Sequence, residues 1–143
     1  MMGKLEIRPF KPEHAYKIWG DKNPLLVKFA KGFTTGQAYT AFLDNQLFAC
    51  GGLVNFWPGC GEVWLLPTAM ALKNPLVLYR TVKHWIAKFV YENKLIRLQA
   101  PVEMGKDINR RFIEHLGFHP EGVLEAYGLQ GQDHIMYALI VRR

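Results

Sequence analysis

One long amphipathic segment, residues 74–93, constrains the fold more than any other feature of this sequence. Its apolar residues recur at intervals of three and four, which places them on one side of an α-helix. Asn74 suits the N-cap of this helix and Pro75 suits its first position. Strand-like segments flank it at residues 61–66 and 95–102, so we expect a right-handed crossover between parallel strands. The apolar positions are Leu76, Tyr79, Val82, Trp85, Ile86, Phe89 and Val90.

The remaining segments predict short helices and antiparallel strands around this crossover. The expected order is β-α-α-β-β-β-α-β-α-β-β, an α+β domain with a mixed central sheet that spans residues 1–143. Gly51-Gly52 lies inside one strand and indicates a bulge or a close backbone approach. The other expected strands are 4–8, 37–43 and 47–56 around an Asp44-Asn45 turn, 118–128 and 134–141. Two short helices are expected near the N-terminus, one from Pro12 and one from Asn23-Pro24 that ends at Gly32 and Gly36. A further helix is capped by Asp107 and ended by Gly117, and its apolar stripe is Ile108, Phe112 and Leu116.

The composition predicts one globular domain, and we expect it in the cytoplasm. Half of the 143 residues are hydrophobic, which excludes a disordered protein, and no run approaches the roughly 18 apolar residues that a membrane span needs. The first ten residues do not have the pattern of a signal peptide. Two cysteines are too few for a disulfide framework or a four-cysteine zinc site, and no metal site is predicted. We expect Cys50 in the core and Cys60 exposed in a turn.

Positive charge is concentrated in one part of the chain. The formal net charge is +6, and residues 73–97 contain six basic residues and one acid, Glu92. Such an excess suits a phosphate-bearing cofactor or a polyanion, and it is equally typical of a solvated helix face. A nucleic-acid binder that uses this helix is a third reading, but the sequence has no base-reading motif, and nucleic acid is not the expected partner.

The order of elements, together with three motifs, is similar to that of the GNAT superfamily of N-acetyltransferases. Leu5-Glu6-Ile7-Arg8-Pro9 resembles the first strand of the family. Residues 47–52, Leu-Phe-Ala-Cys-Gly-Gly, resemble the start of its third strand. The most specific motif extends from Asn109 to Phe118 and resembles a late helix that ends in a Leu-Gly-Phe turn.

The resemblance implies a cofactor, a reaction and a set of residues. The cofactor would be acetyl-CoA, held between the fourth and fifth strands, with its pantetheine arm along Leu65 and Leu66. Its pyrophosphate would lie at the N-terminus of the long helix. The reaction would be acyl transfer to a primary amine of a small molecule or a protein. The implied catalytic residues are Glu62 as base and Tyr127 or Tyr137 as acid; the implied cofactor-binding residues are Met70, Lys73, Asn74, Asn109 and Arg110. For Glu62 a solvent-facing glutamate at a strand end is the plain alternative.

Two departures from the family pattern concern these same residues. The family holds pyrophosphate with Gln/Arg-x-x-Gly-x-Gly/Ala, and the matching positions here are Met70, Lys73 and Pro75. Both glycines are replaced, and proline removes one N–H donor, although a lysine can supply a point charge. The tyrosine that often follows the phenylalanine of the late helix is Ile113 here.

A second resemblance offers a different function. Gly51-Gly52, the strand 63–66, the glycine-free loop, the basic long helix, and Gly105 ahead of Arg111-Phe112 resemble small GNAT-like internal virion proteins of short-tailed bacteriophages. This resemblance implies a catalytically inactive scaffold with viral structural proteins as partners, in the virion or the host cytoplasm. Trp57-Pro58, at an expected hairpin tip, is a candidate contact for a partner chain, and a homodimer is a further alternative.

Overall fold

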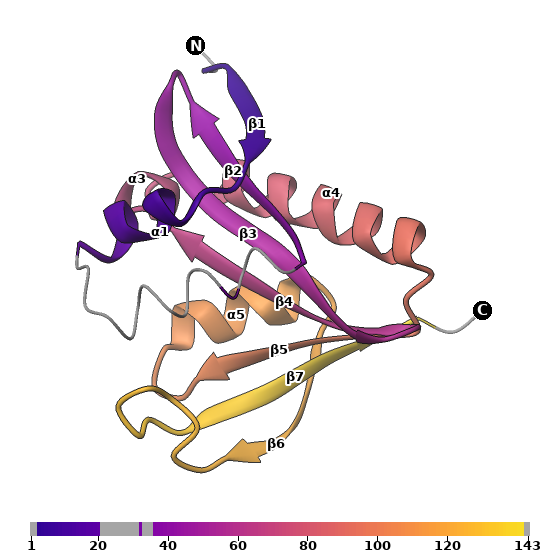
Figure 1. The fold of residues 1–143 in the computed structure, drawn as a ribbon. Helices are drawn as coiled ribbons and strands as arrows, with labels where there is room; N and C mark the ends of the chain where they lie inside the picture. The colour runs from indigo at the N-terminus through magenta and orange to yellow at the C-terminus, as the bar shows by residue number, and fades with distance from the viewer. Residues whose placement is uncertain (1–2, 21–31, 33–35, 142–143) are drawn as a thin grey trace. The chain divides into compact units, whose positions relative to one another are not determined.

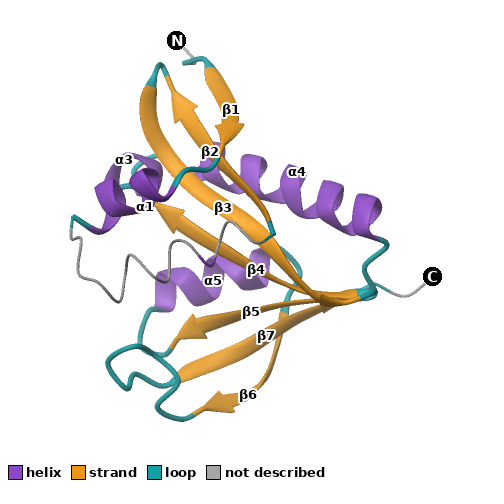
Figure 2. Ribbon diagram, viewed as in Figure 1, coloured by secondary structure: helices purple, strands orange, loops and turns teal. Residues whose placement is uncertain are grey.

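The computed structural model describes residues 3–20, 32 and 36–141, and the chain is an α+β protein (Figures 1 and 2). Its strands follow the order β1-β2-β3-β4-β5-β7-β6. The expected α+β class with a mixed central sheet is therefore confirmed. The helix expected from Asn23 lies outside the described residues. The chain forms two compact units: unit 1 comprises Met1–Val54 and Val63–Leu78, and unit 2 comprises Asn55–Glu62 and Tyr79–Arg143.

Unit 1 contains an antiparallel arrangement of β1 (Leu5–Pro9), β2 (Gln37–Leu43) and most of β3 (Gln46–Trp57). The predicted hairpin between β2 and β3 is confirmed. Asp44 and Asn45 have φ of 51° and 65°, and two successive positive values are what a tight two-residue hairpin turn requires. The ladder shifts register between Ala41 and Phe42.

The predicted close approach at Gly51-Gly52 is also confirmed. A Cβ on Gly52 would collide with the carbonyl oxygen of Gln37 and would lie 2.9 Å from the indole nitrogen of Trp64. Helix α1 (Pro12–Trp19) contributes Ala15 to a core cluster with Phe10 and Cys50, as expected for Cys50.

Unit 2 is arranged around β5 (Arg97–Glu103). The strand pairs antiparallel with β7 (His134–Ile140) along its whole length, and β7 pairs with β6 (His119–Leu124). On its other side β5 pairs parallel with β4 (Cys60–Pro67), through Cys60–Glu62 against Arg97–Gln99. This parallel pairing was expected from the crossover.

Three helices follow β4. They are the short α3 (Ala69–Leu72), the long α4 (Pro75–Asn93) and α5 (Asp107–His115). The predicted long helix is confirmed at both ends. The sequence did not separate α3 from the loop, because four residues are too few to show a helical period. Among the described residues, none of the helices combines the length and apolarity that crossing a bilayer demands.

Three local expectations are corrected by the structure. Cys60 is buried rather than exposed, because it is the first residue of β4 and pairs with β5. Lys106, not Asp107, occupies the N-cap of α5, and Asp107 is the first helical residue. The buried residue of α5 is Ile113, whereas Ile108 is 75% exposed. The apolar stripe is therefore rotated from the predicted one.

Candidate functional site

Strand β5 presents polar side chains on one face of unit 2 and apolar ones on the other. Leu98 and Ala100 are buried, whereas Arg97 and Gln99, which alternate with them, are partly exposed. The Arg97 Nε donates to Gln99 Oε1 at 3.0 Å, as two residues on the same face of a strand can. The alternation therefore gives β5 a polar face.

Two glutamates from other strands extend this face into a continuous chain of hydrogen bonds. Gln99 Nε2 donates to Glu62 Oε1 on β4 at 3.0 Å. At the other end, the guanidinium of Arg97 donates two hydrogen bonds to the Glu121 carboxylate on β6, at 2.9 and 2.5 Å. This pairing raises the pKa of Arg97 and lowers that of Glu121. We call Glu62, Gln99, Arg97 and Glu121 the polar row.

The negative charge of Glu62, at one end of the polar row, affects the pKa of Tyr127. Tyr127 is in the connection between β6 and β7, 51% exposed, and its ring meets that of His134 at a centroid distance of 5.2 Å. Partial burial raises the pKa of Tyr127, and the negative charge of Glu62 raises it further. The hydroxyl therefore keeps its proton well above neutral pH, and a general acid must carry a proton to donate.

Tyr137 is placed differently from Tyr127. It is buried in β7, and its hydroxyl donates to Glu114 Oε2 at 2.7 Å and accepts from Arg110 Nε at 3.3 Å. Burial raises the pKa of Tyr137, and the hydrogen bond from Arg110 partly opposes that rise. The structure thus brings together Tyr137, which the resemblance implied as an acid, and Arg110, which it implied as a cofactor-binding residue. Both are engaged in joining α5 to β7.

The segment that precedes α4 uses its backbone donors internally. Ala71 N–H donates to the hydroxyl of Thr68 at 3.2 Å, and that hydroxyl donates to the Phe48 carbonyl at 2.6 Å. The next three N–H groups donate to carbonyls of residues 68, 69 and 71, at 3.1, 3.1 and 3.0 Å. Pro75 has no N–H. We call residues 68–75 the cap segment, in which every backbone nitrogen from position 71 onward is either bonded or lacks a hydrogen.

The other predicted residues are dispersed over both units. Leu65 and Leu66 are half-buried in β4, and Leu66 packs against the unit 1 core cluster. The Asn74 side-chain amide donates to the Met70 carbonyl at 2.9 Å, while Asn74 O accepts the first hydrogen bond of α4. Lys73 is exposed at the end of α3, and Asn109 is exposed on α5.

Three residues of this region were missing from the sequence prediction: Gln99, Arg97 and Glu121. The alternation of Arg97 and Gln99 with apolar residues was a usable signal, because period two places both on one face. Glu121 gave no such signal. Its pairing with Arg97, 24 residues away, depends on the register of β5, β7 and β6.

Comparison with known proteins identifies the fold. No protein-family model and no curated protein matches the sequence. Among solved structures, a GNAT-family acetyltransferase from Bacillus anthracis has a TM-score of 0.73 at 17% identity, over 98% of this chain and 98% of that one. RimL, a ribosomal α-N-protein acetyltransferase in complex with coenzyme A, has a TM-score of 0.71 at 14% identity, over 96% and 94%. A GNAT acetyltransferase from Streptococcus pneumoniae has 0.67 at 15%, over 97% and 100%. The chain therefore has the GNAT fold.

Proposed function

We propose that this protein, with its two units acting as one domain, is an N-acyltransferase that transfers an acyl group from a thioester to a primary amine. The observation that carries the proposal is the Glu62 carboxyl group, which accepts a hydrogen bond from Gln99 at 3.0 Å and whose negative charge raises the pKa of Tyr127. A carboxyl group and a tyrosine that holds its proton lie in one electrostatic environment on a partly open face of unit 2. The GNAT fold of the chain is consistent with acyl transfer.

Each residue of the pair has a distinct task in this reaction. Glu62 removes a proton from the ammonium group, directly or through water, so that the neutral amine attacks the thioester carbonyl. Tyr127 returns a proton to the departing thiolate. Gln99 holds one oxygen of the Glu62 carboxyl group at 3.0 Å and fixes its direction. Tyr137 is not needed as the acid, since its hydroxyl is engaged by Arg110 and Glu114.

Coenzyme A is the donor that the fold implies, and residues 71–75 offer its pyrophosphate no unoccupied backbone N–H group. A diphosphate at a helix N-terminus needs several unoccupied backbone N–H groups. Residues 71–74 donate theirs within the segment, and Pro75 has none. Lys73 offers an exposed ammonium group, but a single point charge does not replace a set of directed donors. The backbone N–H groups of residues 71–74 therefore give no support to the binding assigned to Lys73 and Asn74.

An acyl-transfer assay with a small donor tests the proposed function directly. Acetyl-pantetheine carries the thioester without any phosphate, so it reports on the chemistry alone. Release of its thiol, measured with a chromogenic disulfide, is expected to depend on added primary amine. Cys50 and Cys60 are both buried and give little background signal. Absence of amine-dependent thiol release across diamines, amino acids and lysine peptides would contradict the proposal.

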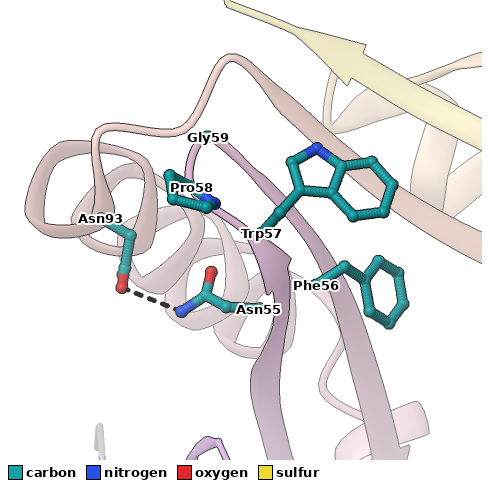
Figure 3. Close-up of a pocket in the computed structure, with 6 residues that line it drawn as sticks. All are labelled: Asn55, Phe56, Trp57, Pro58, Gly59 and Asn93. Atoms are coloured by element: carbon teal, nitrogen blue, oxygen red, sulfur yellow. Dashed lines mark hydrogen bonds between the residues drawn. The ribbon is translucent and has the colours of Figure 1, made fainter.

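An exposed aromatic hairpin tip favours a second candidate function, a non-catalytic assembly protein. Trp57 is 64% exposed and lies beside Phe56, with ring centroids 6.1 Å apart. The two residues line a hollow of about 330 Å³ together with Asn55 and Asn93, and Asn55 Nδ2 donates to Asn93 Oδ1 at 3.2 Å (Figure 3). Large exposed aromatic residues are frequent at protein contacts. Viral structural proteins and a second copy of this chain are the partners predicted for such a protein.

The assembly function has its own test. Trp57→Ser should abolish complex formation with co-purified virion proteins or with a second copy, and it should leave amine-dependent thiol release unchanged. Light scattering and pull-down of the purified chain measure the first effect. An unchanged mass and unchanged pull-down in the variant would remove the hairpin tip as an assembly contact.

A further inference from the structure

We propose that Arg97 and Glu121 are positioning residues, which act through the side-chain amide of Gln99 to hold the Glu62 carboxylate in the direction that proton removal from the amine requires. The inference rests on the proposed acyl transfer and deepens it, because it names two residues that serve the reaction without touching the reacting atoms. All four residues of the polar row belong to unit 2.

The Glu62 carboxyl group has one oxygen engaged and the other available. Glu62 and Gln99 are direct partners in the parallel pairing of β4 and β5, and Gln99 Nε2 donates to Glu62 Oε1 at 3.0 Å. Among the described residues, no hydrogen bond is donated to Glu62 Oε2. The direction of the Gln99 amide therefore decides where the available oxygen points.

A side-chain amide can face either way, and Arg97 removes that choice. The amide oxygen accepts and the amide nitrogen donates, whereas a guanidinium group can only donate. Arg97 Nε donates to Gln99 Oε1 at 3.0 Å, so the amide oxygen must face Arg97 and the amide nitrogen must face β4. In the reversed orientation two donors would meet at Arg97 and two acceptors would meet at Glu62. Gln99 can therefore only donate to Glu62, as a carboxylate requires.

Glu121 fixes the guanidinium group in turn. Its carboxylate accepts from the two terminal nitrogens of Arg97, at 2.9 and 2.5 Å, and this fork leaves Nε directed at Gln99. Because a guanidinium group is planar, the two bonds to Glu121 set the direction of the third donor. The side chains of Arg97 and Glu121 are 29% and 34% exposed, so the pair adds little to stability. Its main effect is on direction.

The backbone of unit 2 accommodates this ion pair across a strand. β7 lies between β5 and β6, so the pair must span it (Figure 1). Glu121 has no ladder partner, because the register of β6 shifts between Pro120 and Gly122, and a bulge of this kind redirects a side chain. Ala138 is the β7 residue opposite Gln99, and its methyl group leaves room on this face for a long side chain.

A rate measurement in two backgrounds tests whether Arg97 acts through Glu62. The assay is amine-dependent thiol release from acetyl-pantetheine. Arg97→Met keeps a long side chain and removes every donor, and kcat should fall by about tenfold with KM within about twofold of the wild type, because a directed hydrogen bond is lost and substrate binding is not. In the Glu62→Gln background the same change should lower kcat by less than about twofold. Equal losses in both backgrounds would overturn the inference, since a merely structural role does not depend on Glu62.

A charge exchange separates direction from ion pairing. Arg97→Glu with Glu121→Arg restores an ion pair between the same two positions, but a glutamate at position 97 has no side-chain donor for Gln99. We expect the Tm of this double variant to stay within about 2–4 °C of the wild type, and its kcat to stay about tenfold or more below it. A double variant with wild-type kcat would show that the pair serves packing alone.

The matched control removes an arginine from another partly exposed ion pair. Arg8 pairs with Glu6 on β1 at 2.8 Å, and Arg8→Met should leave kcat within about twofold of the wild type. Thermal unfolding of every variant checks that the fold is intact. A loss of activity in Arg8→Met equal to that in Arg97→Met would contradict a specific role for Arg97.

A spectroscopic measurement separates this inference from the proposed function. The side-chain amide of Gln99 is observed in a ¹⁵N–¹H spectrum of the whole chain and is identified by its loss in Gln99→Met. We expect its signals to shift in Arg97→Met and in Glu62→Gln, and to keep their positions in Arg8→Met. If these shifts occur and the wild type transfers no acyl group, the positioning contacts are upheld and the proposed function is wrong. If the wild type is active and the signals do not respond to Arg97→Met, the inference is wrong and the proposed function stands.

Discussion

The cap segment of unit 1 and the polar row of unit 2 are both networks of hydrogen bonds, but they differ in what they leave available. In the cap segment the N–H groups of residues 71–74 all donate to acceptors within residues 68–71, and Thr68 ties the segment to the Phe48 carbonyl. In the polar row each bond joins side chains on a partly exposed surface, and the row ends at the carboxyl group of Glu62. The comparison teaches that a network closed on its own backbone stabilises a fold. A network that ends in a partly exposed carboxyl group, as at Glu62, can do chemistry.

The strongest test of this comparison is the removal of the Glu62 carboxyl group. Glu62→Gln should lower kcat/KM for amine-dependent acyl transfer by about 100-fold or more, because general base catalysis contributes roughly 10²–10⁴-fold. Gln99 has an amide oxygen and nitrogen, so the variant side chain can still be held in place. Glu125→Gln, a charge loss at an exposed position two residues before Tyr127, is the matched control. Equal activity of the two variants would remove Glu62 from the reaction.

Removing the side-chain hydrogen bonds of the cap segment should have a smaller effect, on the free energy of unfolding. Thr68→Val removes the acceptor of the Ala71 N–H and the donor to the Phe48 carbonyl. The free energy of unfolding should fall by about 1–2 kcal/mol, as for loss of a helix cap. Thr68→Ser keeps the hydroxyl and should lose much less. Urea unfolding measures both, and two variants of equal stability would show that Thr68 does not hold the segment closed.

The two tyrosines give a test of intermediate size. Tyr137→Phe should lower the free energy of unfolding by about 1 kcal/mol, because Glu114 and Arg110 lose their shared partner, and it should leave kcat nearly unchanged. Tyr127→Phe should do the reverse and lower kcat with little loss of stability. Unfolding curves and steady-state rates on both variants decide between these assignments. A large fall in kcat for Tyr137→Phe alone would show that Tyr137, on β7, is the general acid.

The smallest expected effect is a pH dependence in unit 1. His14 Nδ1 accepts the Lys11 N–H at 3.1 Å and lies 2.7 Å from the Thr40 hydroxyl. Burial lowers the pKa of His14, and the positive charges of Lys11, Lys17 and Arg8 lower it further, against the opposing effect of Glu13.

The unfolded chain therefore binds a proton more readily than the folded protein does. The stabilising contribution of neutral His14 is complete above the ordinary histidine pKa, and it is lost as the pH falls toward the lower folded value. We expect unfolding free energy to decrease between about pH 7 and pH 5 more in the wild type than in His14→Gln. His84→Gln, at an exposed position, is the control. Parallel pH profiles for all three proteins would contradict the prediction.

Much of the fold could be predicted because its signals are local. The Asp44-Asn45 turn, the Pro75 start of α4 and the alternation of residues 4–8, which predicted β1, each depend on a few consecutive residues. The same local reasoning misplaced the face of α5. A nine-residue helix defines its buried side only through what it packs against, and that proved to be Ile113.

The candidate site could be predicted only in part. The resemblance supplied Glu62 and Tyr127, and the negative charge of Glu62 contributes to the raised pKa of Tyr127. Tyr137 and Arg110 could not be placed from the sequence, because their hydrogen bond joins α5 to β7 across 27 residues. Cys60 was misplaced for a similar reason: its neighbouring glycines indicate a turn, but pairing with Arg97 buries it in the sheet.

The sequence by itself determined the class of fold, the long basic helix and the loss of both glycines before that helix. Those features follow from backbone geometry and residue chemistry, which each short segment carries within itself. Only the tertiary structure decided that the Thr68 hydroxyl donates to the Phe48 carbonyl and that Glu62 is held by Gln99. A hydrogen-bond partner is chosen by distance and direction in space. Folding sets both, through strand register and packing, between residues that are far apart in the chain.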